Sequence, residues 1–315
     1  MRNNVLYRLL YAVWYLMSLL PMWVHYLISD VLYVLIYHVL HYRVRVVRSN
    51  LTSSFPEKSE VEIRQIERKF YHRLCDYFVE MVKTMTMSER QMRRRMVIKG
   101  CEVLNECFEE GQSCAVYLGH TFNWEWMTSL PLWVPENVQC GQLYHALESP
   151  AFNRITLEQR QRWGAECIAL VDILRKTIEY KRKQQLTVIG YIGDQVPHWN
   201  NIHHWCWFLN HDTPVMTGAE RIIVKNKQAA FFLDMRQVKR GYYEGEFKLI
   251  TRTPEQLKEY ELTDRYHQLL EKNIRRQPEL WLWSHNRWKR TREEFNRRFQ
   301  VVGGKVIPKE GVEEE

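Results

Sequence analysis

The chain has 315 residues, of which 45% are hydrophobic, and it carries 12 Trp, 17 Tyr and 12 Phe. This composition excludes a disordered or collagen-like chain and predicts a folded body with a large aromatic-rich core. The seven cysteines are scattered without a CxxC pair, which argues against a disulfide framework and a zinc site and indicates reduced cytosolic thiols. The formal net charge of +8 points to anionic partners: lipid phosphates, an acidic carrier protein or nucleic acid.

Residues 1–42 are predicted to form a membrane-associated helical segment. The 21 residues from Leu9 to Ser29 contain no Asp, Glu, Lys or Arg, and a helix of this length matches the roughly 30 Å hydrocarbon core of a bilayer. Pro21 lies in the middle, so a kinked span, a tilted helix and an interfacial helix all stay open, beside a buried helix pair in a soluble core. No small-x-small cleavage site follows, so we expect the anchor to be retained. Three arginines do follow, at positions 43, 45 and 48, and favour a cytoplasmic body.

A helical collar is expected over residues 43–110. Within it, residues 57–90 place apolar side chains at helical spacing with charges on the other face, which predicts one or two amphipathic helices. The apolar positions are Val61, Ile63, Ile66, Phe70, Leu74, Phe78 and Val82.

Residues 111–309 are predicted to form one α/β body, followed by an acidic tail at 310–315. Short apolar runs predict strands at 114–118, 138–144, 166–170, 186–192 and 229–234. Helix-like stretches follow at 123–133, 150–163, 171–184, 215–226 and 255–276, the last one stopped by Pro278. This alternation is typical of an α/β domain with a largely parallel sheet flanked by helices.

The candidate chemistry begins at His120 and Glu125. The sequence has no GxSxG, GxxxxGK[ST], GxGxxG or HExxH motif, which leaves a serine hydrolase elbow, a P-loop, a dinucleotide fingerprint and a zincin without support. His120 ends a predicted strand and precedes a predicted helix, so a chain reversal between them lets its ring fold back toward Glu125. A carboxylate that orients an imidazole makes a general base. The simpler alternative is a histidine that only caps a helix.

Four histidines in a Trp-rich segment also invite a metal-site hypothesis. They are His198, His203, His204 and His211. No carboxylate or thiol completes a compelling ligand set with them, and hydroxyl attack on a thioester needs no metal, so we expect none. The aromatic residues between them are typical of a core, or of a groove for an acyl chain.

Taken together, the motifs resemble the lipid A biosynthesis branch of the lysophospholipid acyltransferase superfamily, the Kdo2-lipid IVA lauroyl/myristoyl acyltransferases. The resemblance covers nearly the whole chain, and it rests on the order and spacing of many short pieces. These are Tyr42 to Leu51, Phe55-Pro56-Glu57, His120 with Glu125, Tyr144, Ser149-Pro150, Arg160 to Gly164, Gly193-Asp194-Gln195, Thr217-Gly218-Ala219 and Pro278 to Lys289.

This resemblance implies a glycerol-3-phosphate acyltransferase-like fold and a membrane-bound O-acyltransferase on the cytoplasmic side of the bacterial inner membrane. The enzyme would move a fatty acyl group from acyl carrier protein, its co-substrate, to a hydroxyl of a lipid A precursor, with no cofactor and no nucleic acid partner. His120 would deprotonate the hydroxyl and Glu125 would orient His120. Arg160, then Arg162, are candidates for the oxyanion or for phosphate, while Asp194 and Gln195 end a strand where α/β sheets place ligand groups.

Three alternatives stay open at this point. The same chemistry would serve an aminolipid, another glycolipid or a lysophospholipid as acceptor. A thioesterase would use the same His120 and Glu125 to activate water instead of a hydroxyl. A nonenzymatic membrane protein with a basic face is a third class, but no recognised nucleic-acid motif supports it.

Overall fold

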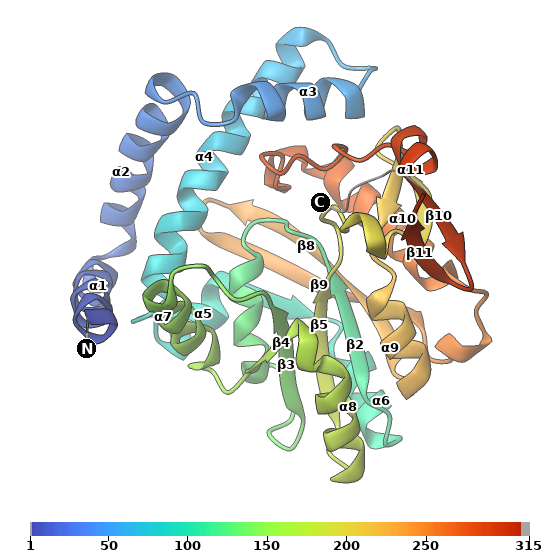
Figure 1. Ribbon diagram of the computed structural model, residues 1–315. Coiled ribbons are helices and arrows are strands. Elements are labelled where there is room, and N and C mark those ends of the chain that lie inside the picture. Colours follow the sequence, from blue (N-terminus) through green and yellow to red (C-terminus); the bar gives the residue numbers. More distant parts are fainter. Residues whose placement is uncertain (1, 310–315) are drawn as a thin grey trace.

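A computed structural model describes residues 2–309, and its centre is a mixed seven-stranded sheet (Figure 1). The strand order is β1-β9-β8-β2-β5-β3-β4. The strands are β1 (Met96–Lys99), β2 (Cys114–Leu118), β3 (Gln139–Tyr144), β4 (Glu166–Ala169), β5 (Thr187–Ile192), β8 (Ala229–Lys239) and β9 (Tyr242–Thr251). Only β8 and β9 pair antiparallel, and all other neighbours are parallel. The prediction of a largely parallel α/β sheet is therefore confirmed.

Helices flank this sheet, and all but the last two of them lie between its strands along the chain. They are α6 (Cys101–Glu109), η2 (Trp124–Leu132), α7 (Pro150–Gln161), η3 (Leu170–Asp172), α8 (Ile173–Arg182), α9 (Gly218–Asn226), η5 (Pro254–Gln256) and α10 (Glu261–Arg276). The helix expected at 123–133 is a 3₁₀-helix. The helix expected at 255–276 begins later, at Glu261, and ends before Pro278 as predicted.

The C-terminal part adds two small hairpins that the sequence did not indicate. One joins β6 (His204–Phe208) to β7 (His211–Val215), and the other joins β10 (Phe299–Val302) to β11 (Lys305–Pro308). Three short helices complete this region: η4 (Trp199–Asn201), η6 (Pro278–Leu280) and α11 (Arg292–Arg298). The predicted acidic tail at 310–315 lies outside the described residues.

The apolar N-terminus folds as two helices that meet at Pro21. Helix α1 (Arg2–Leu19) ends before this proline, and α2 (Met22–Tyr33) begins after it and continues as the π-helix η1 (Val34–Val39). Proline has no backbone N–H to continue the ladder, which explains the break. Among the described residues, Met22–Val39 is the one helical stretch long and apolar enough to cross a membrane, and only 11% of it is buried. Figure 1 shows α1 and α2 along the left edge of the molecule.

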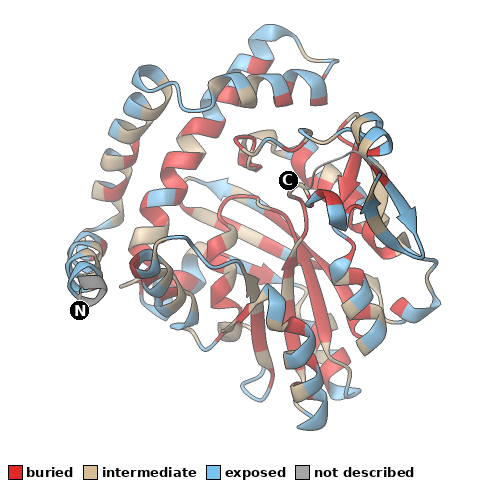
Figure 2. Cartoon of the chain, viewed as in Figure 1, coloured by how far each residue is buried: buried red, intermediate tan, exposed pale blue. Residues whose placement is uncertain are grey.

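Helix α4 (Glu60–Thr84) lies between α2 and the body, with α3 (Val44–Ser54) before it and α5 (Glu89–Arg95) after it. Ser59 starts α4 with a capping box that it closes with Glu62. Figure 2 shows buried residues along most of the helix. The predicted helix is confirmed, but the predicted faces are wrong in part: Val61 is 66% exposed, whereas three acidic residues, Glu67, Asp76 and Glu80, are fully buried. Neighbours on several sides of α4 cover positions that a one-sided pattern assigns to solvent.

Candidate functional site

Strand register brings His120 and Asp194 together. In the parallel pair β2 and β5, Leu118 lies opposite Ile192, and His120 and Asp194 each follow two residues later. The carboxyl ends of neighbouring parallel strands open at one edge of the sheet, where ligand groups gather. The backbone N–H of His120 donates to Asp194 Oδ2 at 2.8 Å, and His120 Nδ1 lies 2.5 Å from Asp194 Oδ1.

Asp194 is a buried carboxylate with a full set of donors. Only 2% of the residue is exposed, and Trp281 Nε1 donates to its Oδ2 at 2.7 Å. Burial acts to raise the pKa of Asp194, but the nearby His120 and the hydrogen bonds from His120 and Trp281 outweigh burial and hold that pKa below its ordinary value. The carboxylate therefore stays ionised at neutral pH and accepts a hydrogen bond from the Nδ1–H of His120.

This hydrogen bond sets the tautomer of His120. An ionised carboxylate has no proton to give, so Nδ1 of His120 carries the N–H and Nε2 keeps its lone pair. The side chain amide of Gln195 lies 3.3 Å from that Nε2. The ring is 18% exposed, so the basic nitrogen is within reach of a substrate hydroxyl.

Gly119 lets the chain pass close to Asp194 just before His120. A Cβ at this position would lie 3.2 Å from Asp194 Oδ2 and would overlap the side chain of Leu270. Leu270 is itself fully buried. A larger residue at 119 therefore displaces either the core or the carboxylate that holds His120.

Glu125 lies in the first turn of η2 and pairs with Arg160 of α7. The Asn123 side chain caps this helix by accepting the Glu125 N–H at 3.1 Å. Arg160 then donates from Nε to Glu125 Oε2 at 2.9 Å and from Nη2 to Oε1. Within residues 2–309 no hydrogen bond or ion pair joins Glu125 to His120. The expected contact is thus replaced by two: Asp194 bonds the imidazole, and Glu125 bonds a guanidinium.

Arg160 is a permanent cation of the site. Burial acts to lower the pKa of Arg160, but the Glu125 carboxylate outweighs burial and raises that pKa above its ordinary value. The Tyr77 hydroxyl lies 3.5 Å from Glu125 Oε1. The Trp124 ring packs between the two halves of the site, with centroids 4.5 Å from Tyr77 and 5.1 Å from His120.

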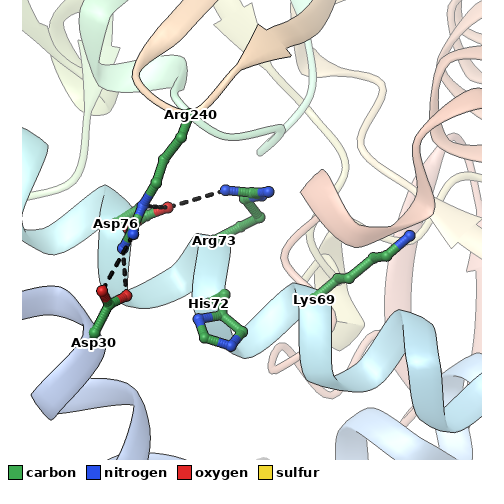
Figure 3. A pocket seen from close by; sticks show the side chains of 6 residues that line it. All are labelled: Asp30, Lys69, His72, Arg73, Asp76 and Arg240. Carbon is green, nitrogen blue, oxygen red and sulfur yellow. Dashed lines mark hydrogen bonds and ion pairs between the residues drawn. The ribbon is translucent and has the colours of Figure 1, made fainter. Parts of the chain in front are cut away.

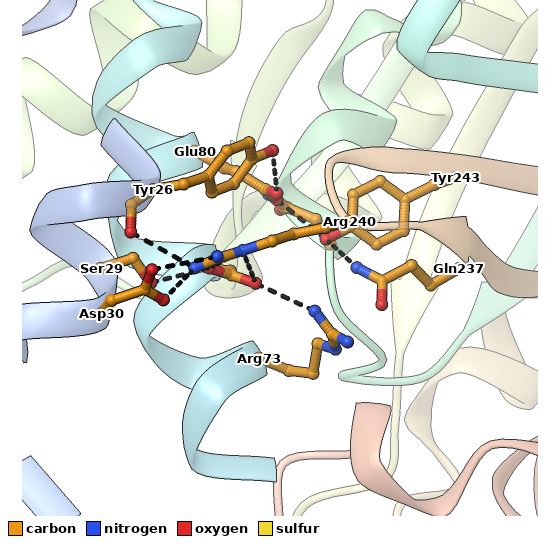
Figure 4. A network of polar contacts seen from close by, with 10 residues as sticks. Tyr26, Ser29, Asp30, Arg73, Glu80, Gln237, Arg240 and Tyr243 are labelled. Carbon is orange, nitrogen blue, oxygen red and sulfur yellow. Dashed lines mark hydrogen bonds and ion pairs between the residues drawn. The ribbon is translucent and has the colours of Figure 1, made fainter. Parts of the chain in front are cut away.

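A further buried carboxylate, Glu80 of α4, belongs to the network of polar contacts in Figure 4. Glu80 Oε2 accepts from Asn123 Nδ2 and from the Tyr243 hydroxyl, both at 2.9 Å, and Oε1 accepts from the Tyr26 hydroxyl at 3.0 Å. Burial raises the pKa of Glu80 to about 7 even though these three donors lower it. Sequence reasoning missed Glu80, although it follows Tyr77 by one helical turn on the inner face of α4.

Arg162 lies at a different place from the imidazole. Its guanidinium donates to the carbonyls of Thr84 and, at 2.8 Å, Met87, where α4 ends, and it packs on the Trp163 ring with its central carbon 4.1 Å from the centroid. Burial lowers the pKa of Arg162. These contacts give Arg162 a part in closing the end of α4.

The histidine-rich segment forms the β6–β7 hairpin and its flanks. His204 pairs with Asp264 at 2.8 Å, and the His211 ring stacks on Trp288 with centroids 4.1 Å apart. Within the described part of the chain, no group of three or more His, Cys, Asp or Glu side chains could hold a metal ion.

The arrangement combines an oriented imidazole at the sheet edge with a fixed cation, Arg160, that is connected to it through Glu125, Tyr77 and the Trp124 ring. Such a set can take a proton from a hydroxyl and stabilise negative charge on an attacked carbonyl. Comparison with known proteins gave one family: the model of the bacterial lipid A biosynthesis acyltransferases matches residues 2–290. No curated protein matched the chain. Because the match spans most of its length, the chain belongs to the bacterial lipid A biosynthesis acyltransferase family.

Proposed function

We propose that this acyltransferase moves a fatty acyl group from acyl carrier protein to a hydroxyl of a lipid A precursor, with His120 as the general base. The observation that carries the proposal is the bond between His120 Nδ1 and Asp194, which directs the lone pair of Nε2 outward. Family membership supports the acyl transfer. The donor, the acceptor and the residue roles are our inference.

In the proposed step, Nε2 of His120 takes the proton of the acceptor hydroxyl as its oxygen attacks the thioester carbonyl carbon. The tetrahedral intermediate then collapses, the carbon–sulfur bond breaks, and the imidazolium returns the proton to the leaving thiolate. Asp194 stabilises the imidazolium while it exists, because a buried carboxylate 2.5 Å from Nδ1 favours the charged ring. The products are an ester and the free thiol of the carrier.

Arg160 is the proposed partner of the thioester oxygen. Glu125 takes Nε and one Nη of Arg160, and in this proposal the other Nη donates to the substrate. The bidentate pair fixes the plane of the guanidinium, so a donor is already oriented when negative charge develops. In this proposal Glu125 acts through Arg160 and Asp194 acts through His120.

Charge supports the choice of donor and the side of the membrane. A chain with a formal charge of +8 attracts an acidic carrier protein. The arginines at 43, 45 and 48 directly follow the apolar N-terminus, which favours a body on the cytoplasmic side of the bacterial inner membrane.

The test is transfer of a labelled acyl chain from acyl carrier protein by the purified full-length protein to a panel of lipid acceptors. We expect the label on lipid A precursors and little free fatty acid without an acceptor. Failure of every glycolipid acceptor, with transfer to a lysophospholipid or aminolipid instead, would contradict the proposed acceptor. Free fatty acid released at full rate without any acceptor would show a thioesterase.

A further inference from the structure

The candidate membrane span is docked along α4 over its whole length. Four contacts occur in antiparallel order, and each joins one turn of Met22–Val39 to one turn of α4. They are Tyr26 to Glu80 at 3.0 Å, Ser29 to Asp76 at 2.7 Å, the rings of Tyr33 and His72 stacked 3.6 Å apart, and Tyr37 to Glu67 at 2.8 Å. All four partners on α4 are ionisable, so the inner face of the apolar helix is polar.

An ion-pair cluster fixes the middle of this helix (Figure 3). Arg240, from the turn between β8 and β9, donates to Asp30 at 2.7 Å and to Asp76 at 2.6 Å, and Arg73 donates to Asp76 at 3.1 Å. These residues line a cavity of about 190 Å³ together with His72 and Lys69. Three separate elements, α2, α4 and the β8–β9 turn, therefore meet at the midpoint of the candidate span.

If Met22–Val39 crossed a bilayer in this arrangement, the side chains of α4 and of the β8–β9 turn that contact it would also lie inside the bilayer. Asp76 and Arg240 would lie near the bilayer centre, where each charged side chain costs about 2.5–3.5 kcal/mol by insertion scales. Glu80 would follow, and with it Asn123 and the turn that carries Glu125, because the same carboxylate bonds both. The catalytic sheet edge would then lie in hydrocarbon, which no water-soluble α/β body tolerates.

The outer face of the same helix is a continuous apolar stripe. Trp23, Leu27, Val31 and Val34 recur at helical spacing, and all are exposed. Helix α1 repeats the pattern with Val5, Leu9, Val13 and Leu16, also exposed. Figure 1 shows α1 and α2 along the same edge of the molecule, and the exposed apolar residues of both stripes lie on these two helices.

Positive charge borders this apolar face. Arg8 on α1 and Arg45, just beyond η1, are both exposed. Arginines beside an apolar surface bind anionic lipid headgroups and extend their apolar stems along the surface. The occupant that fits apolar stripes bordered by arginine is a bilayer that contains anionic phospholipid.

We propose that α1 and α2 with η1 lie along the surface of the membrane and that neither crosses it. The apolar stripes enter the boundary between headgroups and acyl chains, to about 5–10 Å as interfacial helices do. The polar face stays on α4, and the catalytic edge faces the same leaflet from which a lipid acceptor arrives. The orientation of the catalytic edge toward the acceptor's leaflet rests on the proposed function, whereas the position of the helices on the membrane does not.

The test measures the depth of four positions in vesicles of phosphatidylethanolamine and phosphatidylglycerol. A genetically encoded fluorescent amino acid replaces Trp23, Leu27, Val31 or Val34 in the full-length protein, one at a time, and lipids brominated at shallow or deep acyl positions quench it. We expect all four positions to show the same shallow depth. Val61, equally exposed but on α4, is the control and should not be quenched.

A spanning helix would give a different profile, shallow at position 23, deepest near 27 to 31 and shallow again beyond, and this result would overturn the proposal. Absence of quenching at all four positions would also overturn it. For the charges, Arg8→Gln with Arg45→Gln should weaken vesicle binding about thirtyfold. Arg297→Gln, exposed on α11 at the far side of the molecule in Figure 1, should leave binding unchanged. None of these readouts uses acyl transfer, so the proposed function is tested separately.

Discussion

The two carboxylates of the site, Asp194 and Glu125, are held in different ways. Asp194 meets His120 because two neighbouring strands end in register, so the backbone of the sheet sets this contact. Glu125 meets Arg160 because three elements, η2, α7 and α4, pack around one turn, so side chains set that contact. The difference teaches that a short spacing in sequence is a poorer guide to which side chains meet than the pairing of strands.

The largest effect is expected at the imidazole that the sheet edge presents. His120→Ala should lower kcat at least 10²-fold, and up to about 10⁴-fold, because it removes the proposed general base. The variant should stay folded, because the backbone N–H of residue 120 and the Trp281 ring still donate to Asp194, but its melting temperature should fall because a buried carboxylate loses one partner. Steady-state transfer assays with the labelled carrier measure the loss. A variant that keeps more than a tenth of the wild-type kcat would break the assignment.

The next largest effect is expected from the ionisation of Glu80. Its carboxylate bonds Asn123 in the turn that carries Glu125. Its folded pKa, about 7, is above the ordinary value of 4.5, so the folded state keeps a proton that the unfolded state has lost between these pH values. Wild-type stability from this group therefore falls as pH rises, by about 3 kcal/mol in total. Glu80→Gln cannot ionise, so its unfolding free energy relative to wild type should rise by that amount from pH 4 to pH 8.

Urea unfolding at the two pH values measures this difference, and Glu60→Gln, an exposed acid in the same helix, is the matched control. A Glu80→Gln difference that stays constant with pH would show that folding does not raise the pKa of Glu80. The titratable groups that face Glu80 and influence its pKa are Asp76, Tyr26 and Tyr243.

A smaller effect is expected where the backbone passes Asp194. Gly119→Ala should destabilise the fold by about 1–3 kcal/mol, because its Cβ overlaps the buried Leu270 and approaches Asp194 Oδ2. Activity should fall with it, since the displaced carboxylate orients His120. Gly111→Ala, where a Cβ meets nothing within 4 Å, controls for the loss of a glycine, although its positive φ gives it a cost of its own. An unchanged kcat in Gly119→Ala would show that the close approach is not needed.

The smallest effect is expected at Tyr77. Its hydroxyl is 3.5 Å from Glu125, at the limit of a hydrogen bond, and Arg160 holds the same carboxylate twice. Tyr77→Phe should therefore cost less than about 1 kcal/mol of stability and leave kcat nearly unchanged. A large loss of kcat would mean that Tyr77 contacts the substrate. Tyr77 would then have a role of its own beside those of Asp194 and Glu125.

Much of the sheet could be predicted from the sequence. Short apolar runs between turn residues gave β2 at its observed bounds and β5 to within one residue. They also gave the place of Asp194 at the end of a strand. The partner of His120 could not be predicted, because strand order is a tertiary property and a run of five or six residues does not show which strand lies beside it.

Other errors have equally local causes. Strand β9 is not among the predicted strands, because its sequence alternates charged and apolar residues and contains no continuous apolar run. Charge normally marks the outer face of a helix, so the helical pattern predicts that Glu67, Asp76 and Glu80 face solvent. Here they are buried, and tyrosines, Asn123 and arginines donate hydrogen bonds to their carboxylates. A break at Pro21 is one of the arrangements that the sequence allows. The structure has this break because proline cannot continue the helix.

The central claim is that Asp194, not Glu125, orients the base. The direct measurement is kcat with saturating acyl carrier protein and acceptor for Asp194→Asn beside Glu125→Gln. Asp194→Asn should lower kcat by about 10²–10⁴-fold, because an amide no longer fixes the tautomer of His120, while Glu125→Gln, which weakens only the hold on Arg160, loses distinctly less. The reverse order, with Glu125→Gln the more damaged enzyme, would contradict the account.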